Sequence, residues 1–141
     1  SYSFVADKYG RYIFEIELET TRSNFFEAAQ HLGWCPRPHV ELAREKLIKF
    51  NWKIVNRTRN ALVQQGEGIQ VDSRCLPETA SKWSNSRTSG IGDQIGIVTS
   101  VHSFETKKGD EYSIEISNLE NIEGLSKFRP HVVVRAAFGK F

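Results

Sequence analysis

The chain has 141 residues, of which 39% are hydrophobic, 26% are charged and 11% are aromatic. This length suits one domain with one core over residues 1–141, and the aromatic content excludes an intrinsically disordered chain. Nineteen basic and seventeen acidic residues give a formal net charge of +2, which excludes a strong overall field for nucleic acid or membrane. Because no apolar run approaches the ~20 residues that span a bilayer and no signal-peptide pattern occurs, we expect a virion or cytoplasmic protein that is not secreted and has no membrane partner.

The first twenty residues predict a β-hairpin. Residues 2–6 and 11–19 flank a turn-prone segment, residues 7–10. In the second strand, apolar residues alternate with glutamates, which is typical of a strand with one buried and one solvent-exposed face. The apolar positions are Phe14, Ile16 and Leu18, and the glutamates are Glu15, Glu17 and Glu19. We interpret the glutamates as the exposed face rather than as a metal site.

Two helices are predicted next. A short one begins at the capping residue Asn24 and ends at Gly33. A long amphipathic one covers residues 40–65, because apolar residues recur there at steps of three and four. Those residues are Val40, Ala43, Leu47, Phe50, Ile54 and Ala61, widened by Ile48, Val55 and Leu62. One edge of this helix is basic and consists of Lys46, Lys49, Lys53 and Arg57. This edge is either solvated or a docking strip for phosphate or an acidic surface.

A long polar segment, residues 73–93, follows the predicted helix. Loops of this length in small domains are usually functional or disordered, so we expect an interaction loop here. Its candidate contact residues are Arg74, Lys82, Trp83 and Arg87. Trp83 either anchors an interface or folds back onto the core, since an exposed tryptophan without a partner is costly.

The last third of the chain predicts a second hairpin and a final strand. Residues 95–106 and 111–119 flank the turn at residues 107–110, and residues 131–138 form the final strand after Pro130. Cations near the end, Lys127, Arg129 and Arg135, would extend the basic edge if packing brings them together. The expected fold class is therefore α+β, with an antiparallel sheet or partly open barrel packed against one long and one short helix.

No motif predicts catalysis, a cofactor or a metal. His31, Cys35, His39 and Cys75 are zinc-type ligands, but the paired short C-x-x-C spacing of a structural zinc site is absent. Glycine-rich nucleotide loops, a serine elbow and H-E-x-x-H are also absent. We expect a protein that is not an enzyme and needs no cofactor.

The order of segments resembles the tail-completion and head-to-tail joining proteins of tailed bacteriophages. The resemblance covers residues 40–130: the predicted long helix, then Gln70-Val71-Asp72-Ser73-Arg74, then Trp83-Ser84, then a hairpin ending at Asn118 and then Phe128-Arg129-Pro130. It implies a non-enzymatic structural subunit of a phage-like virion, at the head-tail junction or tail end. Its partners would be copies of itself in a ring and neighbouring virion proteins.

The second predicted hairpin is also similar to the first strands of oligonucleotide-binding barrels. In such barrels strand aromatics stack on bases, and lysines in the loop meet phosphates. Phe104, Tyr112, Lys107 and Lys108 would take those roles here. The alternative function is therefore a nucleic-acid-binding module, although an ordinary hairpin turn explains the same residues.

Overall fold

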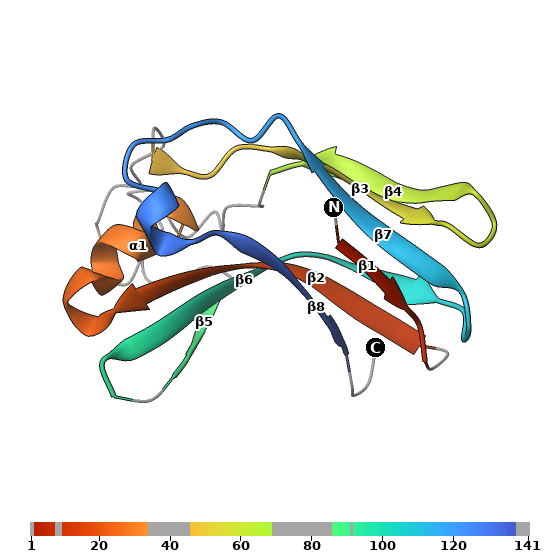
Figure 1. The fold of residues 1–141 in the computed structure, drawn as a ribbon, viewed down its shortest axis with the longest axis horizontal. Helices are drawn as coiled ribbons and strands as arrows, with labels where there is room; N and C mark the ends of the chain where they lie inside the picture. Colours follow the sequence, from red (N-terminus) through yellow and green to blue (C-terminus); the bar gives the residue numbers. More distant parts are fainter. Residues whose placement is uncertain (1, 8–9, 34–45, 69–85, 91, 138–141) are drawn as a thin grey trace, which may run out of the picture.

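The computed structural model describes residues 2–7, 10–33, 46–68, 86–90 and 92–137, and within this part the chain forms two antiparallel four-stranded sheets around one core (Figure 1). The first sheet has the strand order β1-β7-β3-β4 and the second has the order β5-β6-β2-β8. The strands of the first sheet are β1 (Tyr2–Val5), β7 (Glu111–Ser117), β3 (Asn51–Asn56) and β4 (Ala61–Glu67). Those of the second are β5 (Ser86–Ser89), β6 (Gln94–Thr106), β2 (Gly10–Thr21) and β8 (His131–Ala136).

The predicted short helix is confirmed as α1 (Phe25–His31), which follows a 3-10 turn, η1 (Arg22–Asn24). Gly33 stops the helix with a φ of 73°, a left-handed conformation that glycine adopts without strain. His31 is buried, its ring Nδ1 is hydrogen-bonded to the Lys46 carbonyl, and its own carbonyl accepts a bond from the Ile48 N–H at 2.9 Å. Burial lowers the pKa of His31, so the neutral imidazole fits this site.

The predicted long helix is wrong, and with it the α+β fold class. Residues 51–56 form β3 and residues 61–67 form β4, while residues 40–45 lie outside the described part. A step of four residues fits the two-residue repeat of a strand as well as the turn of a helix. Phe50, Trp52, Ile54 and Asn56 are in fact buried at every second position. The turn between the strands ends at Asn60, whose φ of 51° is a conformation that asparagine tolerates.

The predicted strands exist, but their predicted pairing is wrong. β1 pairs with β7 rather than with β2, and β6 pairs with β2 and β5 rather than with β7. β1 and β2 therefore belong to different sheets, as do β6 and β7. The final strand, β8, is confirmed and pairs with β2 from Tyr12–Ala136 to Glu17–His131.

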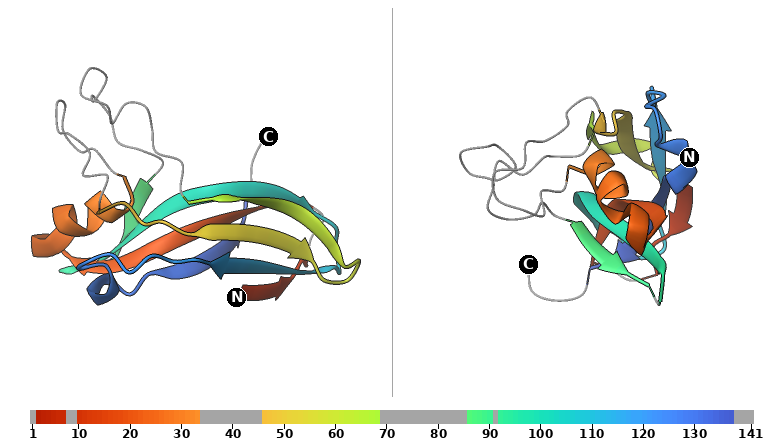
Figure 2. Two further views of the ribbon diagram at one scale, coloured as in Figure 1. Left: turned by 90° about the horizontal axis from the view of Figure 1, so that it is seen from above. Right: turned by 90° about the vertical axis from the view of Figure 1, so that its left-hand side faces the viewer.

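The core lies between the two sheets and is rich in aromatic rings. Phe14 of the second sheet meets Trp52 of the first edge to face, with 5.8 Å between ring centroids. Phe4 of β1 stacks on Tyr112 of β7, with 5.8 Å between ring centroids. The helix α1 lies at the end of the sandwich opposite the β3–β4 turn (Figures 1 and 2). The described residues include no helix that is long and apolar enough to cross a membrane.

Candidate interaction surfaces

The predicted basic edge lies along β3 instead of along a helix. Lys53 lies on β3, Lys49 lies just before it and Arg57 lies just after it, and all three residues are exposed. Acidic residues run beside them on the neighbouring segment: Lys49 Nζ lies 4.0 Å from Glu120 Oε2, and Lys53 is opposite Glu115 in the β3–β7 register. Lys46 lies just before this row, with its backbone carbonyl held by His31. Two of the four cations therefore lie beside a carboxylate, which reduces the excess of positive charge that binding a polyanion requires.

The aromatic residues proposed for base stacking are in the core. Phe104 and Tyr112 are 5% and 2% exposed, and their ring centroids lie 6.0 Å apart within the aromatic cluster. Lys107 and Lys108 are exposed on the turn, where the Lys107 N–H donates a 2.9 Å hydrogen bond to the Tyr112 hydroxyl. In residues 95–119 the lysines are therefore exposed, whereas the two aromatic rings proposed for base stacking are buried.

Of the other predicted contact residues that the structure describes, Lys127 and Arg135 form ion pairs with carboxylates on two different elements, α1 and β2. Lys127 Nζ forms a 2.7 Å ion pair with Glu27 and lies 5.1 Å from the centroid of the Phe128 ring. The hydrogen bond that Lys127 donates to the Glu27 carboxylate lowers the pKa of Glu27. Arg135 pairs with Glu15 at 2.9 Å. Of the predicted interaction loop, Arg74, Lys82 and Trp83 lie outside the described residues, as do Cys35, His39 and Cys75, and the backbone of Arg87 belongs to β5.

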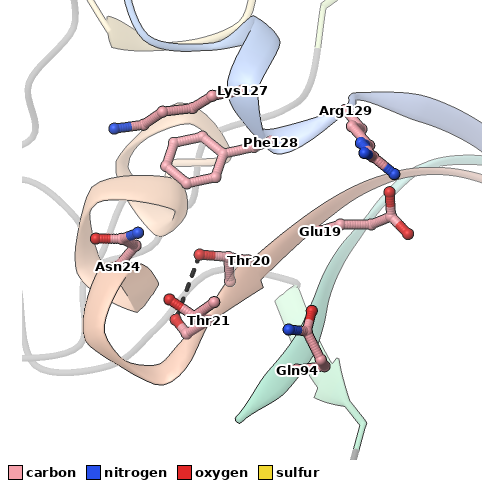
Figure 3. A pocket seen from close by; sticks show the side chains of 8 residues that line it. All are labelled: Glu19, Thr20, Thr21, Asn24, Gln94, Lys127, Phe128 and Arg129. Atoms are coloured by element: carbon pink, nitrogen blue, oxygen red, sulfur yellow. Dashed lines mark hydrogen bonds between the residues drawn. The ribbon is translucent and has the colours of Figure 1, made fainter.

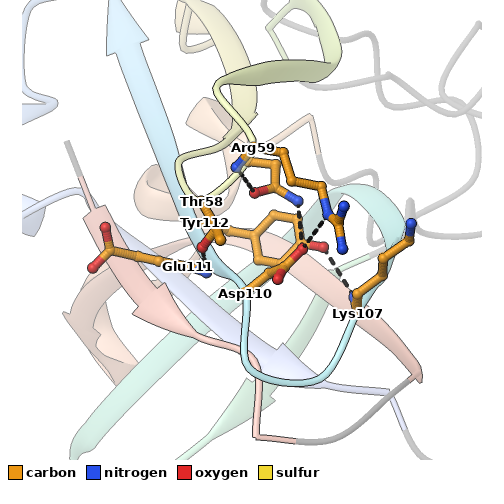
Figure 4. A network of polar contacts seen from close by, with 7 residues as sticks. Thr58, Arg59, Lys107, Asp110, Glu111 and Tyr112 are labelled. Carbon is orange, nitrogen blue, oxygen red and sulfur yellow. Dashed lines mark hydrogen bonds and ion pairs between the residues drawn. The ribbon is translucent and has the colours of Figure 1, made fainter.

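Asp110 joins the turns at one end of the sandwich (Figure 4). Its carboxylate accepts hydrogen bonds from Asn56 Nδ2 at 2.9 Å and Arg59 Nε at 3.0 Å, and its backbone carbonyl accepts one from the Ala6 N–H at 2.9 Å. The side-chain hydrogen bonds from Asn56 and then Arg59 lower the pKa of Asp110. Nearby, the Glu111 N–H donates to Thr58 Oγ1 at 2.8 Å. Because every partner is another part of the turns, we assign this cluster a structural role.

A polar pocket of about 400 Å³ lies at the opposite end, beside α1 (Figure 3). It is lined by Glu19, Thr20, Thr21, Asn24, Gln94, Lys127, Phe128 and Arg129. Arg129 ends the 3-10 turn η4 (Ser126–Phe128) with a left-handed φ of 49°, and Figure 3 shows its guanidinium on the same side of the pocket as the Glu19 carboxylate. The charges of this pocket are mixed, and the described residues hold no cluster of three His, Cys, Asp or Glu side chains that fits a metal.

The outer face of the second sheet is covered by ion pairs. Arg11 meets Glu105 at 3.4 Å, Glu15 meets Arg135, and Glu17 meets His131 at 2.8 Å. The expectation that all three glutamates of β2 face solvent is wrong for Glu15, which is only 1% exposed. Its second carboxylate oxygen accepts a 3.2 Å hydrogen bond from the Ser100 hydroxyl. Glu15 and Glu17 thus pair with side chains of β6 and β8, and the sequence of β2 alone does not predict these partners.

His131 gives this face a pH-dependent contact. Burial lowers its pKa, but hydrogen bonds to the Arg129 carbonyl and the Glu17 carboxylate outweigh burial and raise the pKa above its ordinary value. Both ring nitrogens therefore have acceptors, which favours the imidazolium. The stabilisation by this contact should be complete at a pH below the unfolded-state pKa and should disappear as the pH rises through the raised folded-state pKa.

We expect His131→Gln to cost a few tenths of a kcal/mol in unfolding free energy at pH 5.5 and close to nothing at pH 8.5, since the pair is partly exposed. Urea unfolding of both proteins at the two pH values measures this difference. The buried His31 cancels in the comparison because both proteins contain it. A difference that is the same at both pH values would contradict the contact.

Most of the exposed large apolar side chains lie on the two edge strands of the first sheet, β1 and β4. Among the described residues, six large hydrophobic side chains are exposed, and five of them lie in or next to strands of this sheet: Tyr2, Val5, Leu62, Val63 and Leu119. The sixth is Phe26 of α1. Tyr2 and Leu119 also line an apolar cleft of about 370 Å³ that opens between β1 and β8. The two sheets therefore differ: the second presents charge pairs to solvent, and the first presents apolar strand edges.

Comparison with known proteins identifies no relative of this chain, since no protein family model, no curated protein and no solved structure matches it.

Proposed function

We propose that the chain is a non-enzymatic structural subunit that assembles with copies of itself and with neighbouring proteins through the edges of its first sheet. The observation that carries this proposal is the placement of exposed Tyr2, Val5, Leu62, Val63 and Leu119 on or beside that sheet. These side chains mark both edge strands of the sheet, β1 and β4, and an exposed apolar edge strand can pair with another chain. Glu15, Glu17, Glu27 and Asp110 are instead paired with other side chains, which supports a structural role over a catalytic one.

A phage-like virion, at the head-tail junction or tail end, is the setting that we propose for this subunit, with the virion or the cytoplasm as its location. The support is the sequence resemblance over residues 40–130. Without the predicted long helix, and with β6 and β7 in different sheets, the resemblance depends on the order of sequence motifs alone. The proposal of an assembling subunit is independent of that setting.

Nucleic-acid binding has less support from the described residues. The aromatic rings of Phe104 and Tyr112 are buried, and the lysines along β3 lie beside acidic residues. A base-stacking surface needs exposed rings, and phosphate binding needs an excess of positive charge.

Light scattering coupled to size-exclusion chromatography tests the two functions together. An assembling subunit should gain mass per particle as its concentration rises, and a single-stranded oligonucleotide should not change that mass. We expect moderate salt to leave the association intact, because apolar contacts and backbone hydrogen bonds would hold it. A particle that has the mass of one chain at every concentration, or that forms a salt-sensitive complex with the oligonucleotide, would overturn the proposal.

A further inference from the structure

Strand β4 is an edge strand of unusual composition. It occupies the end of the first sheet, and its exposure is high at almost every residue, including Leu62 at 55% and Val63 at 36%. Residues 61–66 carry no charge and no proline. Among the described residues only β3 pairs with it, so the N–H and C=O groups on its outer edge have no strand partner in this part of the chain.

The other edge strands carry the features that normally prevent edge-to-edge pairing. β1 and β5 have only four residues each, and β8 contains His131 and Arg135, which form ion pairs with β2. Short length and charge both protect an edge. β4 is the longest of the four and has one protective feature, a bulge: its register passes from Leu62 opposite Val55 to Gln64 opposite Ile54, so that Val63 has no partner on β3.

The charges that flank β4 fit a second copy of the same strand. Before the strand stand Arg57 and Arg59, and at its end stands Glu67. When two copies pair antiparallel about a two-fold axis at Val63, the uncharged stretches face each other, and Arg59, in the turn just before each strand, lies at the same end as Glu67 of the other copy. The Arg59 side chain is 57% exposed, and its guanidinium has more donors than the one that binds Asp110. A parallel or shifted arrangement loses this match.

We propose that two copies of the chain associate by antiparallel pairing of their β4 strands, which joins the two first sheets into one continuous sheet. This inference rests on the proposed function and names the contact between subunits. Backbone hydrogen bonds would supply affinity, and the Val63–Val63 contact with the two Arg59–Glu67 pairs would set the register. The interface is isologous, as the symmetry of a two-fold dimer requires.

The test compares Val63→Lys with Val63→Thr and Phe26→Lys by light scattering and sedimentation. Val63→Lys places two like charges at the axis and should weaken dimerisation roughly tenfold or more. Val63→Thr keeps a β-branched, uncharged side chain, and Phe26→Lys adds charge at an exposed apolar site of α1, outside the first sheet, so both should dimerise like the wild type. Circular dichroism checks that each variant is folded.

A cysteine at the proposed axis gives a second measurement. In a Cys35→Ser, Cys75→Ser background, Val63→Cys should form an intermolecular disulfide under mild oxidation, and Lys108→Cys, on an exposed turn, should not. Wild-type association that survives Val63→Lys, with no cross-link at position 63, would overturn this inference and leave the proposed function standing. A wild-type chain that remains monomeric, together with a Val63→Cys variant that does not cross-link, would overturn both the inference and the proposed function.

Discussion

Replacing Trp52 with alanine should lower the free energy of unfolding by about 3–5 kcal/mol, as expected for removing a large buried aromatic side chain. Trp52 is 7% exposed and lies between the two sheets, where it contacts Phe14 and also lies 5.2 Å from the His102 ring, measured between centroids. The opposite position on β4 is Gly66, where an added Cβ would come within 2.6 Å of Trp52 Cζ2. The lack of a side chain at Gly66 therefore leaves room for the Trp52 indole. Urea denaturation at fixed pH measures the loss.

Leu62→Ala is the matched control, because it separates the observed strands from the predicted helix. The helix places Leu62 on its buried face and Trp52 away from it, whereas the structure exposes Leu62 and buries Trp52. We expect Leu62→Ala to change the free energy of unfolding by less than about 0.5 kcal/mol, as for most surface positions. A larger loss for Leu62→Ala than for Trp52→Ala would contradict the strand assignment of residues 51–67.

The sequence predicts a single strand or helix correctly where the spacing of its apolar residues fits only one of the two periods, that of a strand or that of a helix. Phe14, Ile16 and Leu18 alternate strictly with glutamates, and β2 forms with those residues buried. In residues 40–65, by contrast, the steps of four fit both periods, and no glycine or proline marks the turn between β3 and β4. The alternation of Phe50, Trp52, Ile54 and Asn56, together with the β-branched residues of β3, is the signal that favours the strand.

The pairing of the strands depends on contacts that are distant in sequence. A turn between two strands usually indicates a hairpin, but Asp110 bonds to Asn56 and Arg59, more than fifty residues earlier, and so holds the 107–110 turn over the first sheet. The same limit applies to the candidate surface. Lysines at steps of four are compatible with a solvated edge or with a docking strip for an anion, and only the β3–β7 register shows that Glu115 lies opposite Lys53. Leu62 and Val63 become an exposed edge only once β4 is placed last in its sheet.

The second large effect is expected at Arg135, whose replacement by methionine should cost roughly 3 kcal/mol of unfolding free energy. Removing Arg135 takes away an opposite charge that offsets the burial of Glu15, and the penalty for losing one partner of such a pair exceeds the net value of the pair itself. Glu15 is 1% exposed and accepts hydrogen bonds from Arg135 Nε at 2.9 Å and from Ser100. Methionine keeps much of the apolar stem of arginine, so the loss reports on the charge.

Arg11→Met on the same sheet is the control for this effect. Arg11 meets Glu105 at 3.4 Å in a pair whose glutamate is 77% exposed, so water screens the charges and replaces the lost partner. We expect its removal to cost less than about 1 kcal/mol. Glu15→Gln in the Arg135→Met background should recover part of the loss, because a neutral amide is easier to bury than a carboxylate. Equal costs for Arg135→Met and Arg11→Met would show that Glu15 is hydrated in solution, and the outer face of the second sheet would then be an ordinary solvated surface.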